Sequence, residues 1–334
     1  MRRLFPLRLL LIPALILGTL ILPTPPSVLA QSADATNGLE ISPVLVELNA
    51  EKGNTYTVTI KVRNVTTSNL FFDTSVDDFG AKDESGSPSI LLEESAEPLA
   101  TSIKSWVRSI PSFSLAPTEA QTIKATVSVP ASAEPGGHYG VIRFAGHEKE
   151  SDKGNVGLIA SAGTLLLVSV KGDAKEALDL ASFEATNNDG KAGVAFESGP
   201  ITFVSRFKNT GTVHVKPIGQ IEVKDAFGKS VATLPVNSAE GNVLPDSTRR
   251  FESKLDQTWL FGHYTADISI AYGNTGQAIV RTLSFWVIPW KIILAALLIV
   301  ATIVYVLRVL IKRYNSYIIS RNNANNRKSS KKRK

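Results

Sequence analysis

Histidine and cysteine carry much nucleophilic and metal chemistry, and this chain has four histidines and no cysteine. The lack of cysteine excludes disulfides, thiol nucleophiles and thiolate zinc sites. His138 and His263 belong to a repeated motif, His147 lies in a polar stretch, and His214 follows a turn. None has a second histidine at metal-ligand spacing, and catalytic Ser, phosphate-loop and His-Glu-x-x-His motifs are missing. The sequence predicts no catalytic, cofactor or metal residues, and a protein that is not an enzyme; a site assembled from distant residues stays open.

Paired carboxylates occur at Asp77-Asp78 and Asp83-Glu84, within the acidic stretch 77–86, which also contains Gly and Ser. Oxygen ligands of this kind can hold a cation. The stretch lacks the Asp-x-Asp-x-Asp-Gly spacing and the closing Glu of a calcium loop. It is therefore predicted to be a solvated loop.

The formal net charge of +6 is unevenly distributed along the chain. Residues 1–30 and 291–334 contain 14 Lys and Arg and no acid. Residues 31–290 therefore hold 22 Lys and Arg against 30 Asp and Glu, a net charge of about −8. Because nucleic-acid binding needs a basic face, the acidic middle region argues against a nucleic-acid partner.

Residues 1–30 have the order of a secretory signal peptide. Three arginines precede the apolar run 9–22, which is followed by prolines and the small-residue site Val28-Leu29-Ala30. This order predicts export and cleavage after Ala30. A retained anchor stays open, although the 14-residue run is shorter than the ~20 residues of a spanning helix. Export without cysteine favours a bacterial source.

A second apolar stretch, residues 287–311, is predicted to be a single transmembrane helix. Its charges, Lys291 and Arg308, lie near its ends, and aromatic residues flank it at Trp286, Trp290, Tyr314 and Tyr317. The tail 312–334 contains nine bases, which predicts a cytoplasmic C-terminus and an extracellular N-terminal region. Contact of this tail with anionic lipid, RNA or a partner stays open.

The region between the apolar ends is predicted to be all-β, as two tandem immunoglobulin-like β-sandwich domains, 31–174 and 175–286. Alternating or β-branched runs recur there between Gly, Pro, Asn and Asp. In the first half the predicted strands are 39–48, 55–63, 70–76, 121–129, 139–144 and 158–170. In the second half they are 178–185, 201–208, 219–225, 249–254, 264–272 and 278–287.

Three landmarks occur in the same order in both halves of this region. An alternating strand ends at Asn64 and again at Asn209, where the side chain is expected to bond backbone groups of the following turn. A Leu and a Pro then enter a polar strand, at Leu115-Ala-Pro117 and Leu244-Pro245. Gly-His-Tyr opens an apolar strand at Tyr139 and at Tyr264. Each tyrosine resembles a tyrosine corner, whose hydroxyl bonds upstream backbone.

The first half is longer between its landmarks, 75 positions from Asn64 to Tyr139 against 55 from Asn209 to Tyr264. This difference predicts an insertion near 77–110. Trp106 lies within it and forms helical spacing with Ile103, Val107 and Ile110, a pattern that also permits a strand. Core packing is the predicted role of Trp106.

Landmarks across residues 38–172 match those of a known family: Ser42-Pro43, the strand 58–64, Trp106, Leu115-Ala-Pro117, Val127-Ser-Val-Pro130 and Pro135-Gly-Gly-His-Tyr139. The segment resembles the N-terminal domain of the WxL-interacting surface proteins of Gram-positive bacteria. The plan of signal, two sandwiches, membrane helix and basic tail is also similar. The resemblance implies that the first domain binds peptidoglycan and that the second binds WxL-type or host-matrix proteins. The second domain matches only by plan, which leaves its ligand open. The shared motifs are turns and core positions, so the ligand-binding residues stay unknown.

Two function classes remain. The first is a membrane-anchored surface protein, without catalysis, that binds the cell wall or protein partners. Trp106, Phe113 and Tyr139 are candidate sugar contacts, although core packing is the preferred interpretation for each. The second is a chaperone or assembly factor for surface proteins, since pilus chaperones share the sandwich architecture. A chaperone would need an exposed strand edge with basic anchoring residues.

Overall fold

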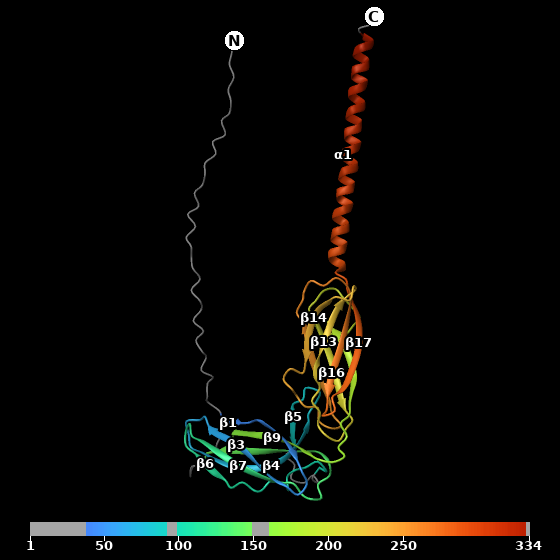
Figure 1. The fold of residues 1–334 in the computed structure, drawn as a ribbon. Coiled ribbons are helices and arrows are strands. Elements are labelled where there is room, and N and C mark those ends of the chain that lie inside the picture. Colours follow the sequence, from blue (N-terminus) through green and yellow to red (C-terminus); the bar gives the residue numbers. More distant parts are fainter. Residues whose placement is uncertain (1–37, 92–98, 149–159, 332–334) are drawn as a thin grey trace.

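The computed structural model describes residues 38–91, 99–148 and 160–331. Two β-sandwiches meet at an angle, and a long helix, α1, leaves the second from the end away from the first (Figure 1). We call strands β1 to β9 domain 1 and strands β10 to β17 domain 2. The predicted signal peptide and its cleavage site at Ala30 lie outside the described residues.

Domain 1 packs a three-stranded sheet, in the order β1-β3-β7, against a larger sheet in the order β2-β9-β8-β4-β5, with β6 beside β4. Its strands are β1 Leu39–Ser42, β2 Leu45–Ala50, β3 Thr55–Asn64, β4 Leu70–Ala81, β5 Pro88–Leu91, β6 Phe113–Leu115, β7 Ala120–Ser128, β8 Gly136–His147 and β9 Ala160–Val170. Alternation explains the core: in β3, Val58, Ile60 and Val62 are buried while their neighbours are exposed.

The predicted strand 39–48 is two strands in the structure. Pro43 interrupts it, because proline has no amide hydrogen for a ladder. β1 pairs with β3 in the small sheet, whereas β2 pairs in parallel with β9 in the large sheet. The Thr164 hydroxyl donates to the Pro43 carbonyl oxygen at 2.8 Å and holds the crossing point. One continuous alternating run therefore contributes to both layers.

Domain 2 repeats the sandwich with sheets in the orders β10-β12-β15 and β11-β17-β16-β13-β14. Its strands are β10 Leu178–Thr186, β11 Ala195–Phe196, β12 Ile201–Asn209, β13 Ile218–Asp225, β14 Ser230–Val236, β15 Thr248–Leu255, β16 Gly262–Tyr272 and β17 Gln277–Val287. Phe203, Phe207 and Phe285 are fully buried between the sheets. The prediction of two immunoglobulin-like sandwiches is confirmed.

Asn64 and Asn209 play the predicted part in the two repeats. Both side chains are completely buried. The Asn64 amide donates to the carbonyl oxygens of Ser68 and Leu115, and the Asn209 amide donates to those of Val213 and Val243. Each amide thus ties the end of a central strand to two loops of its own domain.

The predicted insertion contains strand, turns and bridges. β4 continues to Ala81 and pairs with β5, so Asp77 and Asp78 belong to a strand, and their prediction as loop residues was wrong. Arg143 pairs with Asp77 at 2.7 Å, and Asp78 accepts from Ser102 at 2.6 Å. Trp106 lies among turns and isolated bridges, in neither a helix nor a named strand, and it is buried as predicted.

α1 extends over Trp290–Lys331, and its apolar part, Trp290–Ser316, is long and apolar enough to cross a membrane. The predicted start at Val287 was wrong, because Val287 is the last residue of β17 and is buried in domain 2. The predicted tail is helical as far as Lys331.

Candidate functional site

Domain 2 covers part of the outer face of the larger sheet of domain 1. β8 is buried at every position from Gly136 to Ile142, so both of its faces are covered. Alternation directs Ile142 to the core of domain 1 and Tyr139 and Val141 to the outer face, where they cluster with Phe79 and Leu167. Leu244 of domain 2 packs against this cluster. The two domains thus share a small apolar interface.

Tyr139 joins the domains through its hydroxyl. The backbone N–H of His214 donates to it at 2.9 Å, and Nδ1 of His214 lies 3.3 Å away. Burial raises the pKa of Tyr139 and lowers that of His214. The prediction of a tyrosine corner at Tyr139 was wrong, since the bond reaches the other domain. At Tyr264 it is confirmed, because that hydroxyl bonds the backbone N–H and carbonyl of Phe261, three residues upstream.

Charged and polar pairs surround the apolar contact. On one side Glu47 of β2 pairs with Lys216 at 3.3 Å and accepts from the Asn242 amide. Burial alone would raise the pKa of Glu47, but the Asn242 hydrogen bond and the charge of Lys216 bring it below its usual value. On the other side Glu84 pairs with Arg206 at 2.8 Å. These contacts hold the β4–β5 turn and β2 against domain 2.

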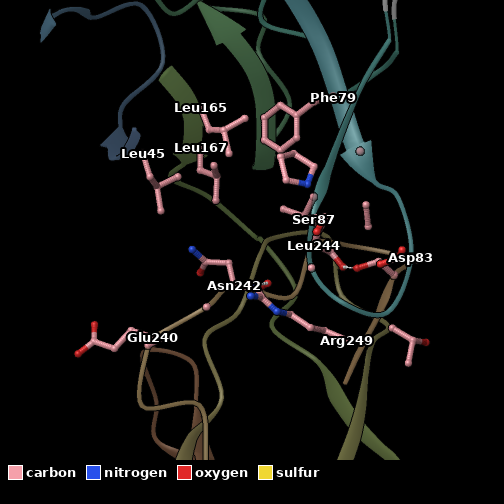
Figure 2. A pocket seen from close by; sticks show the side chains of 18 residues that line it. Leu45, Phe79, Asp83, Ser87, Leu165, Leu167, Glu240, Asn242, Leu244 and Arg249 are labelled. Atoms are coloured by element: carbon pink, nitrogen blue, oxygen red, sulfur yellow. Dashed lines mark hydrogen bonds between the residues drawn. The ribbon is translucent and has the colours of Figure 1, made fainter. Parts of the chain in front are cut away.

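A cavity of about 220 Å³ lies within this interface (Figure 2). Its apolar wall comes from domain 1, with Leu45, Phe79, Leu165 and Leu167. The opposite wall is formed by residues 239–249 of domain 2, which include the first two residues of β15, and by residues 83–88 of domain 1 between β4 and the start of β5. We call this cavity the interdomain pocket.

Arg249 supplies the positive charge of the interdomain pocket. Its Nη1 donates to the Asn242 carbonyl at 2.7 Å, and its guanidinium lies 5.4 Å from the ring centre of Phe251. A Cβ at Gly86 or Gly241 would overlap the guanidinium and force Arg249 to shift, and the positive φ of Gly86 also favours glycine there. The buried Nε has no hydrogen-bond partner among the described residues, and burial lowers the pKa of Arg249.

An open strand edge begins at the interdomain pocket. The N–H of Leu165 donates to the Val44 carbonyl and the N–H of Lys171 to the Ala50 carbonyl, which sets the phase of the parallel ladder. Even-numbered residues of β2 therefore face β9, while Leu45, Glu47 and Asn49 direct their N–H and C=O groups outward. No strand of the described chain pairs with this side of β2. Leu45 belongs to both the edge and the pocket wall.

Of the three candidate sugar contacts, only Tyr139 lies at the domain interface. Trp106 is buried and packs against His138 with ring centres 4.5 Å apart, and Phe113 packs on Phe72 at 5.1 Å. Core packing is therefore the role of both. Within the described ranges no group of three or more His, Asp or Glu side chains could hold a metal ion.

Most residues of the interdomain pocket were not singled out from the sequence, and Asp83 and Leu244 were singled out for other reasons. Arg249 and Leu45 read as ordinary positions of β-strands. The one sequence signal was the Gly-containing turns at Gly86 and Gly241, which leave room for a large side chain.

Comparison with known proteins finds a likeness in fold alone. No family model and no curated protein matches the chain. Among solved structures it is similar to the class 5 fimbriae chaperone CfaA, with 11% identity over 73% of this chain and 98% of that one and a TM-score of 0.37. The E. coli chaperone DraB has 12% identity over 74% and 96% of the two chains and a TM-score of 0.33. A Porphyromonas gingivalis W83 protein of unknown function has 12% identity over 75% and 99% and a TM-score of 0.29.

Proposed function

We propose that this chain is a non-catalytic, membrane-anchored surface protein that binds an extended segment of a partner protein at the junction of its two domains. The segment would add a strand to the outer edge of β2 and place one side chain in the interdomain pocket. The observation that carries this proposal is the position of Leu45, which lies on the unpaired edge and in the wall of the pocket.

The strand edge supplies the affinity that any extended backbone can use. Unpaired N–H and C=O groups on an edge strand form a template for another strand. In peptide recognition by strand addition, main-chain hydrogen bonds give affinity and neighbouring pockets give specificity. β2 offers three outward residues, Leu45, Glu47 and Asn49, beside such a pocket.

The size of the interdomain pocket favours a side chain over a free small molecule. Small-molecule sites usually measure about 300–1,000 Å³. The cavity of about 220 Å³ is smaller, and its apolar wall suits one large aliphatic or aromatic residue. The side chain of Arg249, which also lines the pocket, adds a positive charge that would attract a carbonyl or carboxylate oxygen of the same segment.

Binding of peptidoglycan by domain 1 stays a prediction based on resemblance, as does a WxL-type partner. Sugar polymers are usually met by exposed aromatic faces, and Trp106, Phe113 and Tyr139 are packed in the interior or the interface. No described feature of domain 1 favours the wall polymer over a protein segment.

The anchor is α1, with both domains on one side of the bilayer. The basic tail after it supports an extracellular position for the domains. A reporter that is active only in the cytoplasm should work when fused after Lys334. Activity of an export-dependent reporter at that position would contradict this orientation.

A chaperone or assembly factor is a second candidate that would use the same groove. The edge of β2 and the guanidinium of Arg249 supply the strand template and the basic group that such a function needs. The two candidates differ in the fate of the bound segment. A chaperone would release its segment to a second subunit, whereas a surface receptor would keep it.

Selection with displayed random peptides tests the proposal. The full chain in detergent, immobilised by its tail, should enrich extended peptides that share one large apolar residue. Ala81→Trp, which fills the interdomain pocket from its rim, should reduce their binding about tenfold, equivalent to about 1.4 kcal/mol. Ala116→Trp is the matched control, since Ala116 is also exposed but lies near the other end of β4.

Equal binding by both variants would contradict a site in the interdomain pocket. Binding to the cell wall is tested in parallel, by sedimentation of the same protein with purified peptidoglycan. If the chain pelleted with the wall and selected no peptide, the wall-binding prediction would replace this proposal.

A further inference from the structure

We propose that the end of domain 2 next to α1 is a lipid-contact surface, which rests aromatic side chains in the interfacial layer of the bilayer that α1 spans. This inference depends on the membrane anchor of the proposed function. We call the surface, formed by Phe227, Trp259, Phe261 and Trp286, the juxtamembrane rim. Its ligand is the headgroup and upper acyl region of a lipid bilayer.

Strand register gathers these residues at one end of domain 2. Gly262 pairs with Val287 at the end of β17, so the segment 256–261 ends beside the start of the helix. Asp225 pairs with Tyr264, which brings the β13–β14 turn containing Phe227 to the same end. In Figure 1 this is the end of domain 2 from which α1 leaves, opposite the end that meets domain 1.

The aromatic side chains of the juxtamembrane rim are unusually exposed. Phe227 is 95% exposed, Trp259 85% and Phe261 70%, although most aromatic residues of the domain pack in its core. Exposed apolar residues are ordinary when scattered, but a group of them marks an interaction surface. Trp and Tyr in particular prefer the boundary between water and hydrocarbon.

Local hydrogen bonds hold the aromatic turns in their outward positions. Asp225 accepts from the backbone N–H groups of Phe227 and Lys229 at 2.9 and 3.0 Å. Leu260 is buried between Trp259 and Phe261, so its two neighbours point away from the core. The corner hydroxyl of Tyr264 then bonds both backbone groups of Phe261. The side chains are thus presented by fixed turns.

The connection to α1 leaves no room for a water layer between this end and the bilayer. Only Ile288 and Pro289 separate β17 from the helix, and the Ile288 N–H donates to Phe196 of domain 2 at 2.8 Å. Lys291 in the first turn pairs with Glu197 at 2.9 Å. The 27-residue span is about 40 Å long, while the hydrocarbon core is about 30 Å thick. Trp290 and the charged Lys291 place the first turn of α1 in the interfacial layer, beside the juxtamembrane rim.

The charges near the juxtamembrane rim are balanced, which indicates an aromatic contact and not one driven by anionic lipid. Lys291 pairs with Glu197, and Lys254 pairs with Asp256 at 2.7 Å. Lys229 lies beside Asp225 in the same turn. Contact should therefore form on zwitterionic phosphatidylcholine and persist in salt.

The absence of cysteine makes a direct test simple. Single variants Phe227→Cys, Trp259→Cys and Phe261→Cys of the full chain are spin-labelled and placed in phosphatidylcholine vesicles. Collision with lipid-soluble oxygen is compared with collision with a water-soluble nickel complex. The matched control is Val280→Cys, equally apolar and 66% exposed, on β17 away from the membrane end. Leu298→Cys, inside the span, reports on the anchor itself.

For labels in the juxtamembrane rim, the ratio of oxygen collisions to nickel-complex collisions should be severalfold higher than for the label at 280. This difference should be the same at low and high salt. If the label at 298 is in lipid while those at 227, 259 and 261 match position 280, the inference is overturned and the anchor stands. If the label at 298 also lies in water, the proposal that α1 is a membrane anchor is overturned as well. Spin–spin broadening at 259 that rises with protein density would assign the surface to a second copy and overturn the lipid contact.

Discussion

The hydroxyl of Tyr139 in domain 1 accepts a hydrogen bond from the backbone N–H of His214 in domain 2, 75 positions later. Its counterpart in the repeat, Tyr264, bonds only within domain 2. Two tyrosines in the same sequence motif thus have different partners. In domain 1 the residue holds one domain against the other, and this difference leads to the first prediction.

Tyr139→Phe should loosen the domain interface. It leaves the His214 N–H without its acceptor, at a cost of about 1–3 kcal/mol for a buried donor. Amide hydrogen exchange should therefore accelerate at His214 and Thr212, while the core of domain 1 keeps its protection. Tyr264→Phe is the matched control and should destabilise domain 2 alone. Faster exchange through the core of domain 1 in Tyr139→Phe would contradict an interface role.

Asn64→Ala and Asn209→Ala should each destabilise one domain strongly. Removal of the Asn209 side chain leaves the carbonyl of Val213 and the N–H of Gly211 without a partner, while the Val243 carbonyl keeps its bond from the Val215 N–H. Each orphaned buried group costs about 1–3 kcal/mol. Denaturant unfolding should show the larger loss in the mutated domain. Asn188→Ala, at an exposed turn, should leave the free energy of unfolding unchanged; an equal loss there would refute the argument.

The interface should weaken as pH falls below about 6.5. Burial lowers the pKa of His214 from 6.5, so the separated domains bind a proton that the joined domains do not, and stability is lost as pH decreases through this range. Among its neighbours, the charge of Lys216 also lowers the pKa of His214 and that of Glu47 raises it. Protonation of Glu47, whose pKa is lowered from 4.5, reduces the stability only below that pH. Unfolding measured at pH 7 and pH 5 should differ in the native chain. In His214→Gln, which cannot titrate, the difference should shrink; an unchanged difference would assign it to other groups.

Much of each sandwich could be predicted from local patterns, because alternation in a strand such as β3 marks the buried face directly. The short strands β5, β6 and β11 were missed, since two to four residues carry no period. β14 was missed because Pro235 interrupts its pattern, and proline is tolerated there only because β14 is an edge strand.

The site was less predictable than the fold. The interdomain pocket combines Leu45 with Arg249, about 200 positions apart, and no spacing rule joins such residues. The partner of Tyr139 could not be deduced from its motif either, since the motif is shared with Tyr264. The packing of one domain on the other determines both the residues of the pocket and the partner of Tyr139.

Asn49→Pro should weaken segment binding without unfolding domain 1. Asn49 directs its N–H away from β9, so proline removes one outward donor and leaves the ladder between β2 and β9 intact. Loss of one strand-addition hydrogen bond, together with the proline ring at the edge, should reduce peptide affinity about tenfold, or about 1.4 kcal/mol. Asn49→Ala is the control, because it removes the side chain and keeps the N–H. Titration of a selected peptide, with thermal unfolding of each variant, separates the outcomes: equal affinity of Asn49→Pro and Asn49→Ala, in chains of equal stability, would exclude the outer edge of β2 as the binding strand.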